Sequence, residues 1–136
     1  MNTSQESPSR KQVTAAVIVK DGKILVAQRG LQDKLANKWE FPGGKLENCE
    51  TPEACLKREI QEELGIDVHV GSYLCSSFFD YDHISIELMA FRCEWVSGLL
   101  KNNEHQALAW IEPCNFKSLD MAPADWPIVE HILNQG

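Results

Sequence analysis

The sequence lacks any long apolar run: no stretch approaches the 18 apolar residues of a membrane-spanning helix. It also lacks an excess of positive charge, because the formal net charge is −7 at pH 7. A basic stripe is needed to follow a nucleic-acid backbone, so a nucleic acid polymer is not an expected partner. The polar start, MNTSQESPSRKQ, has no apolar segment typical of a secretion signal. We therefore expect a soluble, cytoplasmic protein that does not act at a membrane.

Paired cysteines are missing as well. The five cysteines are odd in number and widely spaced, with no CxxC pair, which argues against a disulfide framework and against a zinc site. Reduced thiols agree with a cytoplasmic location. With 136 residues and 43% hydrophobic content, the chain is large enough for one core and too small for a second domain. We expect a flexible polar tail over residues 1–11 and one domain over residues 12–134.

Strand patterns occupy most of that domain. VTAAVIVK and KILVAQR flank Asp21-Gly22, a dipeptide typical of a hairpin turn, and two longer β-prone runs flank Asp82-His83. WEFPGG is expected to be a short strand broken by Pro42, and QALAWIE a further strand. NFKSLDM is expected to contain a helical turn and DWPIVEHIL a C-terminal helix. Together with the helix described next, these elements predict an α/β/α sandwich, with a mixed β-sheet between helices.

The main helix is predicted over residues 52–64. Thr51 is a natural N-cap, Pro52 suits the first helical position, and Gly65 suits the left-handed residue that ends a helix. Leu56, Ile60 and Leu64 form a stripe that would attach the helix to the core.

Three carboxylates lie on this helix at i, i+3 and i+4, which places their Cβ atoms about 5 to 6 Å apart. They belong to Glu59, Glu62 and Glu63, and Arg58 can offset only part of their charge. Clustered hard oxygen ligands suit Mg²⁺ or Mn²⁺, with substrate phosphates completing the coordination shell. The alternative interpretation of these acids alone is a solvated helix face.

The spacing across residues 44–66 is more informative than the charge. The segment GKLENCETPEACLKREIQEELGI follows the pattern GX5EX7RE, aliphatic, XEEXG, aliphatic, without a gap or a substitution. This pattern is the signature of the Nudix hydrolases, and the chain resembles that family. The resemblance is strongest to the MutT-like branch, through ANKWEFPGGKLE, the hairpin ending in Gln28-Arg29, EHQALAW and APADWP, and it covers roughly residues 12–134.

The resemblance implies a Nudix α/β/α sandwich and a metal-dependent hydrolysis of nucleoside triphosphates to a nucleoside monophosphate and pyrophosphate. The substrate would be of the 8-oxo-dGTP diphosphatase type or the CTP pyrophosphohydrolase type, and the reaction would clear unwanted nucleotides. Glu59 is the implied general base, with Glu62 or Glu104 as alternatives. Glu50 and Arg58 resemble the internal salt bridge of the signature, and Gly44 and Gly65 its structural glycines. The implied ligands of Mg²⁺ or Mn²⁺ are Gly43, through its carbonyl, Glu59, Glu62, Glu63 and Glu104.

The resemblance also implies a nucleotide site. Arg29 could present a forked set of donors to phosphate oxygens, or could be a surface arginine at a strand end. Asp125 stands where many 8-oxo-dGTP enzymes have Asn; an ionised Asp only accepts hydrogen bonds, from a cytosine amino group or from guanine N1 and N2. The alternative role for Asp125 is an N-cap of the last helix. The implied nucleotide-binding residues are Arg29, Glu40, Phe41, Pro42, Gly43 and Asp125.

Aromatic residues and histidines leave further alternatives. Phe41, Phe78, Phe79 and Trp126 are candidates for stacking on a base, and each is also a candidate core residue. The four histidines have no metal-ligand spacing, and His105, beside Glu104, is the one selected for testing.

Two other functions are considered. One is a Nudix hydrolase of dinucleotides such as ADP-ribose or NADH, and the other is a non-catalytic module that binds nucleotide or a protein partner. A small-molecule nucleotide is the expected substrate of the enzyme, and the sequence leaves a monomer and a homodimer equally open.

Overall fold

The computed structural model describes residues 10–135 of the chain. Five strands follow the order β3-β2-β1-β5-β4, and β6 pairs with β2. β1 runs parallel to β5, whereas the other pairings are antiparallel, so the sheet is mixed. The elements are β1 (Arg10–Lys20), β2 (Lys23–Gln28), β3 (Trp39–Glu40), α1 (Pro52–Leu64), β4 (Ile66–Asp80), β5 (Ser85–Gly98), β6 (Ala107–Ile111), the 3-10 helices η2 (Pro113–Ser118) and η3 (Pro123–Asp125), and α2 (Trp126–Asn134).

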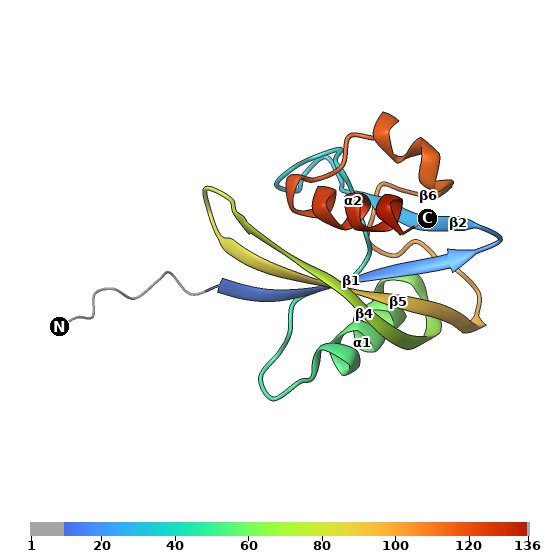
Figure 1. The fold of residues 1–136 in the computed structure, drawn as a ribbon. Helices are drawn as coiled ribbons and strands as arrows, with labels where there is room; N and C mark the ends of the chain where they lie inside the picture. The colour runs from blue at the N-terminus through green and yellow to red at the C-terminus, as the bar shows by residue number, and fades with distance from the viewer. Residues whose placement is uncertain (1–9, 136) are drawn as a thin grey trace.

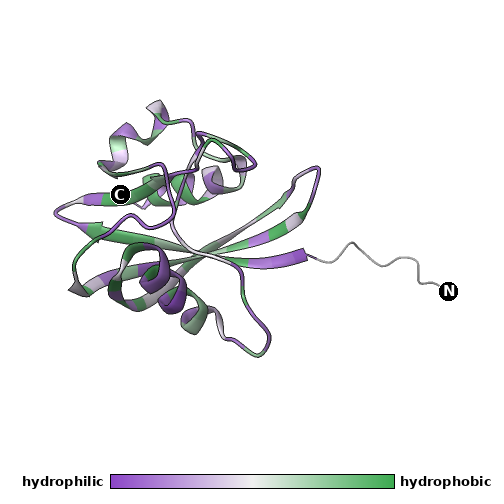
Figure 2. Cartoon of the chain, turned by 180° about the vertical axis from the view of Figure 1, so that it is seen from behind, coloured by the Kyte–Doolittle hydropathy of each residue, from purple (hydrophilic) through white to green (hydrophobic). Residues whose placement is uncertain are grey.

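The two helices cover opposite faces of the sheet (Figure 1). Successive residues of a strand point to opposite faces, and β1 shows this division. Ala16 and Ile18 lie in the core cluster that contains the α1 residues Leu56, Ile60 and Leu64. Ala15 and Val17 lie in the cluster that contains the α2 residues Ile128 and Val129. Figure 2 shows the same layering, with hydrophobic strands in the middle and a hydrophilic outer side on α1. The predicted α/β/α sandwich is therefore confirmed.

The predicted hairpins are confirmed by backbone conformation and register. Asp21 and Gly22 have φ values of 53° and 76°, the paired positive values of a tight hairpin turn, and Val19 opposes Ile24. The β4–β5 hairpin turns over residues 81–84, where the Tyr81 and Ile84 backbones bond to each other.

The expectation of a tail over residues 1–11 is wrong for its last two residues. Residues 1–9 lie outside the described part of the chain, but Arg10 and Lys11 belong to β1 and pair with Ser85 and Ile86 of β5. The polar side chains of Arg10 and Lys11 do not indicate a strand in the sequence, and the strand that they pair with, β5, lies far along the chain. The helical turn expected within NFKSLDM is observed as η2, which begins at Pro113, two residues before that segment. No helix in the described part is long and apolar enough to cross a membrane.

Candidate active site

A cavity of about 600 Å³ is lined by β1, the glycine loop after β3, α1, the β4–β5 turn, the segment before β6, and η3. Several predicted site residues do not reach it: Pro42, Glu50, Arg58, Glu59, Glu62 and Gly65 are absent from its lining. The structure brings together the others, which are Arg29, Glu40, Phe41, Gly43, Gly44, Glu63, Glu104 and Asp125.

The glycine loop is fastened to β1 by its backbone. The Thr14 amide and hydroxyl both donate to the Gly44 carbonyl, at 2.8 and 3.0 Å, and the Ala16 amide donates to the Pro42 carbonyl at 2.8 Å. Pro42 therefore positions the loop and does not face the cavity. The Gly43 carbonyl, between these two, accepts no hydrogen bond from a residue that the structure describes.

Two glycines are required by close approach. A Cβ at Gly43 would overlap the carbonyl group of Thr14, and φ there is +158°. A Cβ at Gly44 would overlap the Glu59 carboxylate, with Glu59 Oε1 among the nearest atoms. Glu59 thus lies directly behind Gly44, which itself lines the cavity.

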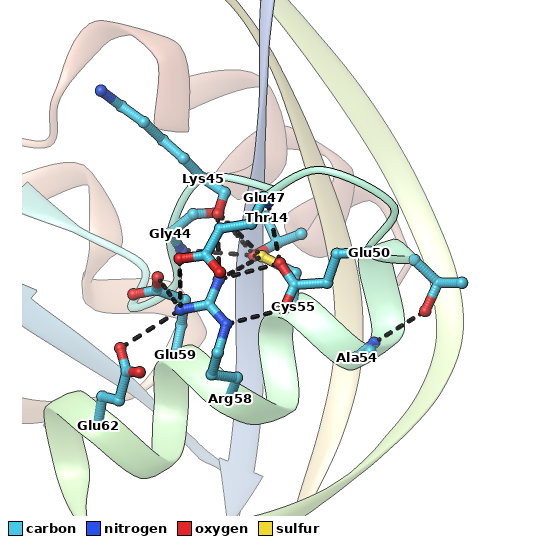
Figure 3. Close-up of polar contacts among 11 residues, drawn as sticks. Thr14, Gly44, Lys45, Glu47, Glu50, Ala54, Cys55, Arg58, Glu59 and Glu62 are labelled. Atoms are coloured by element: carbon cyan, nitrogen blue, oxygen red, sulfur yellow. Dashed lines mark hydrogen bonds and ion pairs between the residues drawn. The ribbon is translucent and has the colours of Figure 1, made fainter.

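Arg58 organises the acids on the outer side of α1 (Figure 3). Its Nε and Nη2 bond to the two oxygens of Glu50 at 2.7 and 3.0 Å, which confirms the salt bridge implied by the signature. The bonds from Arg58 hold the pKa of Glu50 down, to about 2. Arg58 Nη1 donates to Glu59 Oε2 at 2.8 Å and to Glu62 at 3.3 Å. The guanidinium therefore orients Glu59 and leaves its Oε1 toward Gly44.

Glu63 is buried, with only 5% of its surface exposed. Burial, reinforced by the charges of Glu59, Glu104 and Glu40, raises its pKa to about 9. Its Oε1 has no hydrogen-bond partner among the described residues. The three helix acids thus differ in exposure: Glu63 is buried and interacts with Glu59, which Arg58 also binds, whereas the Glu62 side chain is 54% exposed. Within residues 10–135, no three His, Cys, Asp or Glu side chains form a preassembled metal site.

This donor set fits a divalent cation. Glu63 is buried, its Oε1 has no partner among the described residues, and it interacts with three other acids. It shares the cavity with the Gly43 carbonyl. The site therefore has hard oxygen donors and too little positive charge to balance them. Glu63, Glu104 and the Gly43 carbonyl border the cavity, and Glu59 approaches it behind Gly44. Glu62, whose side chain is 54% exposed, is the most peripheral of the implied ligands.

Asp125 is buried at the other side of the cavity. Its Oδ2 accepts a hydrogen bond from the Phe41 amide at 2.9 Å, and its side chain makes no capping bond at the start of α2. Asp125 therefore occupies the N-cap position of α2, as the alternative role predicts, but its carboxyl does not cap the helix. Burial, with the charge of Glu40, raises the pKa of Asp125 well above its ordinary value. The carboxyl links the loop after β3 to the beginning of α2.

Arg29 is not a free surface residue. Its Nη1 lies 3.0 Å from Glu40 Oε1, and its Nε donates to the Lys34 carbonyl at 2.7 Å. The second oxygen of Glu40 lies 3.2 Å from His105 Nε2. Arg29, Glu40 and His105 thus form one polar chain along the cavity wall.

Of the four aromatic candidates for base stacking, only Phe41 lines the cavity. Phe79 and Trp126 pack against the core cluster that contains α2, as their alternative assignment predicts. Phe78 is 57% exposed, with the Arg10 guanidinium 5.2 Å from its ring centroid.

Sequence reasoning missed two aromatic residues of the wall. Tyr81 and His83 lie at the β4–β5 turn, line the cavity and stack at 5.8 Å with an interplanar angle of 25°. The Tyr81 hydroxyl accepts a hydrogen bond from the Ala124 amide at 2.9 Å. The predicted turn at Asp82-His83 marked their place in the chain, but only the folded arrangement brings that turn beside Asp125.

The comparisons with known proteins agree with this geometry. The model of the NUDIX domain family matches residues 9–132. The chain is 44% identical over 119 residues to the CTP pyrophosphohydrolase of Escherichia coli, covering 88% of each protein. It is 37% identical over 120 residues to the putative 8-oxo-dGTP diphosphatase 2 of Mycobacterium tuberculosis, covering 83% of this chain and 81% of the relative.

Solved structures give the same result. The solution structure of the E. coli ORF135 protein superposes with a TM-score of 0.84 at 41% identity, covering 93% of this chain and 91% of that chain. The MutT NUDIX hydrolase from Burkholderia pseudomallei superposes with a TM-score of 0.82 at 27% identity, covering 93% and 99%.

The fold, the complete signature and these matches place the chain in the NUDIX hydrolase family. Within the family it belongs to the MutT-like branch, among relatives named CTP pyrophosphohydrolase and 8-oxo-dGTP diphosphatase.

Proposed function

We propose that this chain is a cytoplasmic, Mg²⁺-dependent nucleoside triphosphate pyrophosphohydrolase of the MutT type, with Mn²⁺ as an alternative ion. It would hydrolyse an 8-oxo-dGTP-like or a CTP- or dCTP-like nucleotide and so remove unwanted nucleotides from the pool. The observation that carries the proposal is the buried Glu63 carboxyl, whose Oε1 has no hydrogen-bond partner among the described residues, on a cavity that Arg29 also lines. The cavity thus contains acids that need a metal cation and also a positively charged side chain, Arg29, that can bind phosphate.

Binding of the nucleotide follows from the charges along the wall. Arg29, Lys34 and Lys45 line the cavity, and they are suited to the phosphate oxygens of the substrate. Phe41 and Asp125 would contact the base, as an apolar face and a buried polar group respectively. Gly43, Glu59, Glu62, Glu63 and Glu104 are the proposed metal ligands, and a divalent cation held by them supplies charge neutralisation and a more acidic water.

Glu59 is the proposed general base. Arg58 Nη1 donates to its Oε2 at 2.8 Å. Its Oε1 is directed to Gly44, and Gly44 lines the cavity. The carboxylate would accept a proton from water as the water oxygen bonds to the α- or the β-phosphorus; the bond between that phosphorus and the bridging oxygen breaks, and the bridging oxygen leaves with the other phosphate fragment. The products are a nucleoside monophosphate and pyrophosphate.

The test is release of pyrophosphate from CTP, dCTP, 5-methyl-dCTP and 8-oxo-dGTP with Mg²⁺. Cleavage of ADP-ribose and NADH, which yields no pyrophosphate, is measured in parallel by release of AMP. We expect turnover of at least one triphosphate, abolished by EDTA. A faster reaction with ADP-ribose than with any triphosphate would assign the chain to the dinucleotide hydrolases. Nucleotide binding without any turnover would assign it to the non-catalytic modules.

Glu59→Gln is expected to lower kcat by about 10² to 10⁴-fold because the amide cannot accept the proton. Glu53→Gln is the matched control, since Glu53 is exposed in the first turn of the same helix. The two variants should melt within a few degrees of the wild type. Wild-type activity in Glu59→Gln would remove Glu59 from the mechanism.

A further inference from the structure

His105 is a buried side chain that the proposed mechanism does not use. Its side chain is 8% exposed and lies on the cavity wall, next in sequence to Glu104. Its Nε2 lies 3.2 Å from Glu40 Oε2, while its Nδ1 is closed to solvent and has no partner among the described residues. A carboxylate only accepts hydrogen bonds, so Nε2 is the donor in this contact.

The carboxylate of Glu40 is held from both sides. His105 donates to Oε2, and Arg29 Nη1 donates to Oε1 at 3.0 Å. The Nε of Arg29 donates to the Lys34 carbonyl at 2.7 Å, which leaves Nη2 as the guanidinium nitrogen without a protein partner among residues 10–135. The direction in which the guanidinium faces the cavity therefore depends on where Glu40 is held.

The backbone around His105 is fixed independently of its ring. The His105 amide donates to Asn102 Oδ1 at 2.9 Å. The Gln106 amide donates to the Gln28 carbonyl at 2.8 Å, and its side-chain amide donates to the Arg29 carbonyl at 3.2 Å. A substitution of the ring should leave this segment in place, so the effect of the ring itself can be measured.

We propose that His105 is a positioning residue: through its Nε2 it holds Glu40 in the orientation that aims the Arg29 guanidinium at the phosphates of the substrate. The inference rests on the proposed function, and it assigns His105 no contact with substrate. Because Arg29 serves the polyphosphate, the loss of His105 should affect all triphosphates alike. The preference between bases, which depends on Asp125 and Phe41, should stay unchanged.

The two amides of similar shape provide the test. The side-chain nitrogen of Gln falls near the position of His Nε2, and that of Asn near Nδ1. We expect His105→Gln to keep kcat/KM within about threefold of wild type, and His105→Asn to lower it about tenfold or more, as other supporting residues do. The loss should be equal for CTP and 8-oxo-dGTP. His69→Asn, at an exposed position of β4, is the control for histidine substitution.

A double-mutant cycle with Glu40→Gln completes the test. If His105 acts through Glu40, adding His105→Asn to Glu40→Gln should lower kcat/KM by less than about twofold. The role is overturned if the Gln and Asn variants lose activity equally at unchanged Tm, or if His105→Asn retains full activity. It is also overturned if the losses of kcat/KM in His105→Asn and Glu40→Gln add fully in the double mutant. This outcome does not depend on His105→Gln, so it tests the role even if that variant is unstable. A wild type without triphosphate turnover would instead count against the proposed function.

Discussion

At residue 43 the space for a side chain is taken by the backbone of β1. We expect Gly43→Ala to lower the free energy of unfolding by about 3 kcal/mol, because its Cβ would meet the Thr14 carbonyl, which cannot move without disturbing the strand. The measurement is urea unfolding. Gly30→Ala is the control, since its nearest neighbour would be Asp33 Oδ2 at an ordinary 3.6 Å. Equal stability of the two variants would contradict the packing described here.

Asp125 should make stability depend on pH. Burial raises its pKa in the folded state well above the ordinary value of 3.8, so the unfolded chain loses this proton first as pH rises. Stability should therefore fall above about pH 4 until the folded-state pKa is passed. Asp125→Asn keeps an oxygen for the Phe41 amide and removes the titration. Its free energy of unfolding should decline less than that of the wild type between pH 5 and pH 8; parallel curves would contradict the assignment.

At this scale, sequence reasoning succeeded where the signal was local. The spacing of the signature identified Glu50 and Arg58 as a pair. The two residues are eight positions apart in the sequence and are bonded at 2.7 Å. Sequence reasoning assigned Asp125 to the site but did not identify its partner, the Phe41 amide, which lies 84 residues away. Adjacency to a helix suggested a cap, but the carboxyl is directed to the site by tertiary structure.

At the scale of elements, α1 begins and ends where its sequence predicts. The Thr51 hydroxyl accepts from the Ala54 amide at 3.1 Å, and Gly65 has φ of 71°, so both ends are set by neighbouring residues. β1 shows the opposite case, because its first two residues, Arg10 and Lys11, gain strand structure only from β5. Capping chemistry is readable in one segment of sequence; strand pairing across a mixed sheet is not.

The β4–β5 turn and the start of α2 are joined by one hydrogen bond. Tyr81→Phe would leave the Ala124 amide without its partner, and we expect a loss of about 1 to 2 kcal/mol in the free energy of unfolding. Tyr73→Phe, in the preceding strand β4, is the control, since Tyr73 is 57% exposed and its hydroxyl bonds, among the described residues, only to the Ser76 hydroxyl. Thermal and urea unfolding measure both. An identical loss in the two variants would show that the Ala124 contact is not what stabilises this junction.

At the scale of the whole molecule, the thiols report on global unfolding. Cys49 and Cys114 are exposed, whereas Cys55 and Cys93 are buried, and burial raises the pKa of Cys93 to about 12. We expect iodoacetamide to modify Cys49 and Cys114 in the native protein, and Cys93 only after denaturation. Mass spectrometry of peptides along a urea series measures the order. Rapid native modification of Cys93 would contradict the sheet packing.

The parallel pairing of β1 with β5 also has a consequence for synthesis on the ribosome. Ala15 of β1 pairs with Ala90 of β5, so β1 cannot form this pairing until about 75 further residues have been synthesised. Their synthesis takes on the order of 4 to 15 seconds. Until then the nascent chain can form the β1–β2 hairpin, the β2–β3 pairing and, later, α1. The sheet that supports the acids of α1 is thus completed late, and a chaperone that shields β1 during this interval should raise the yield of folded protein.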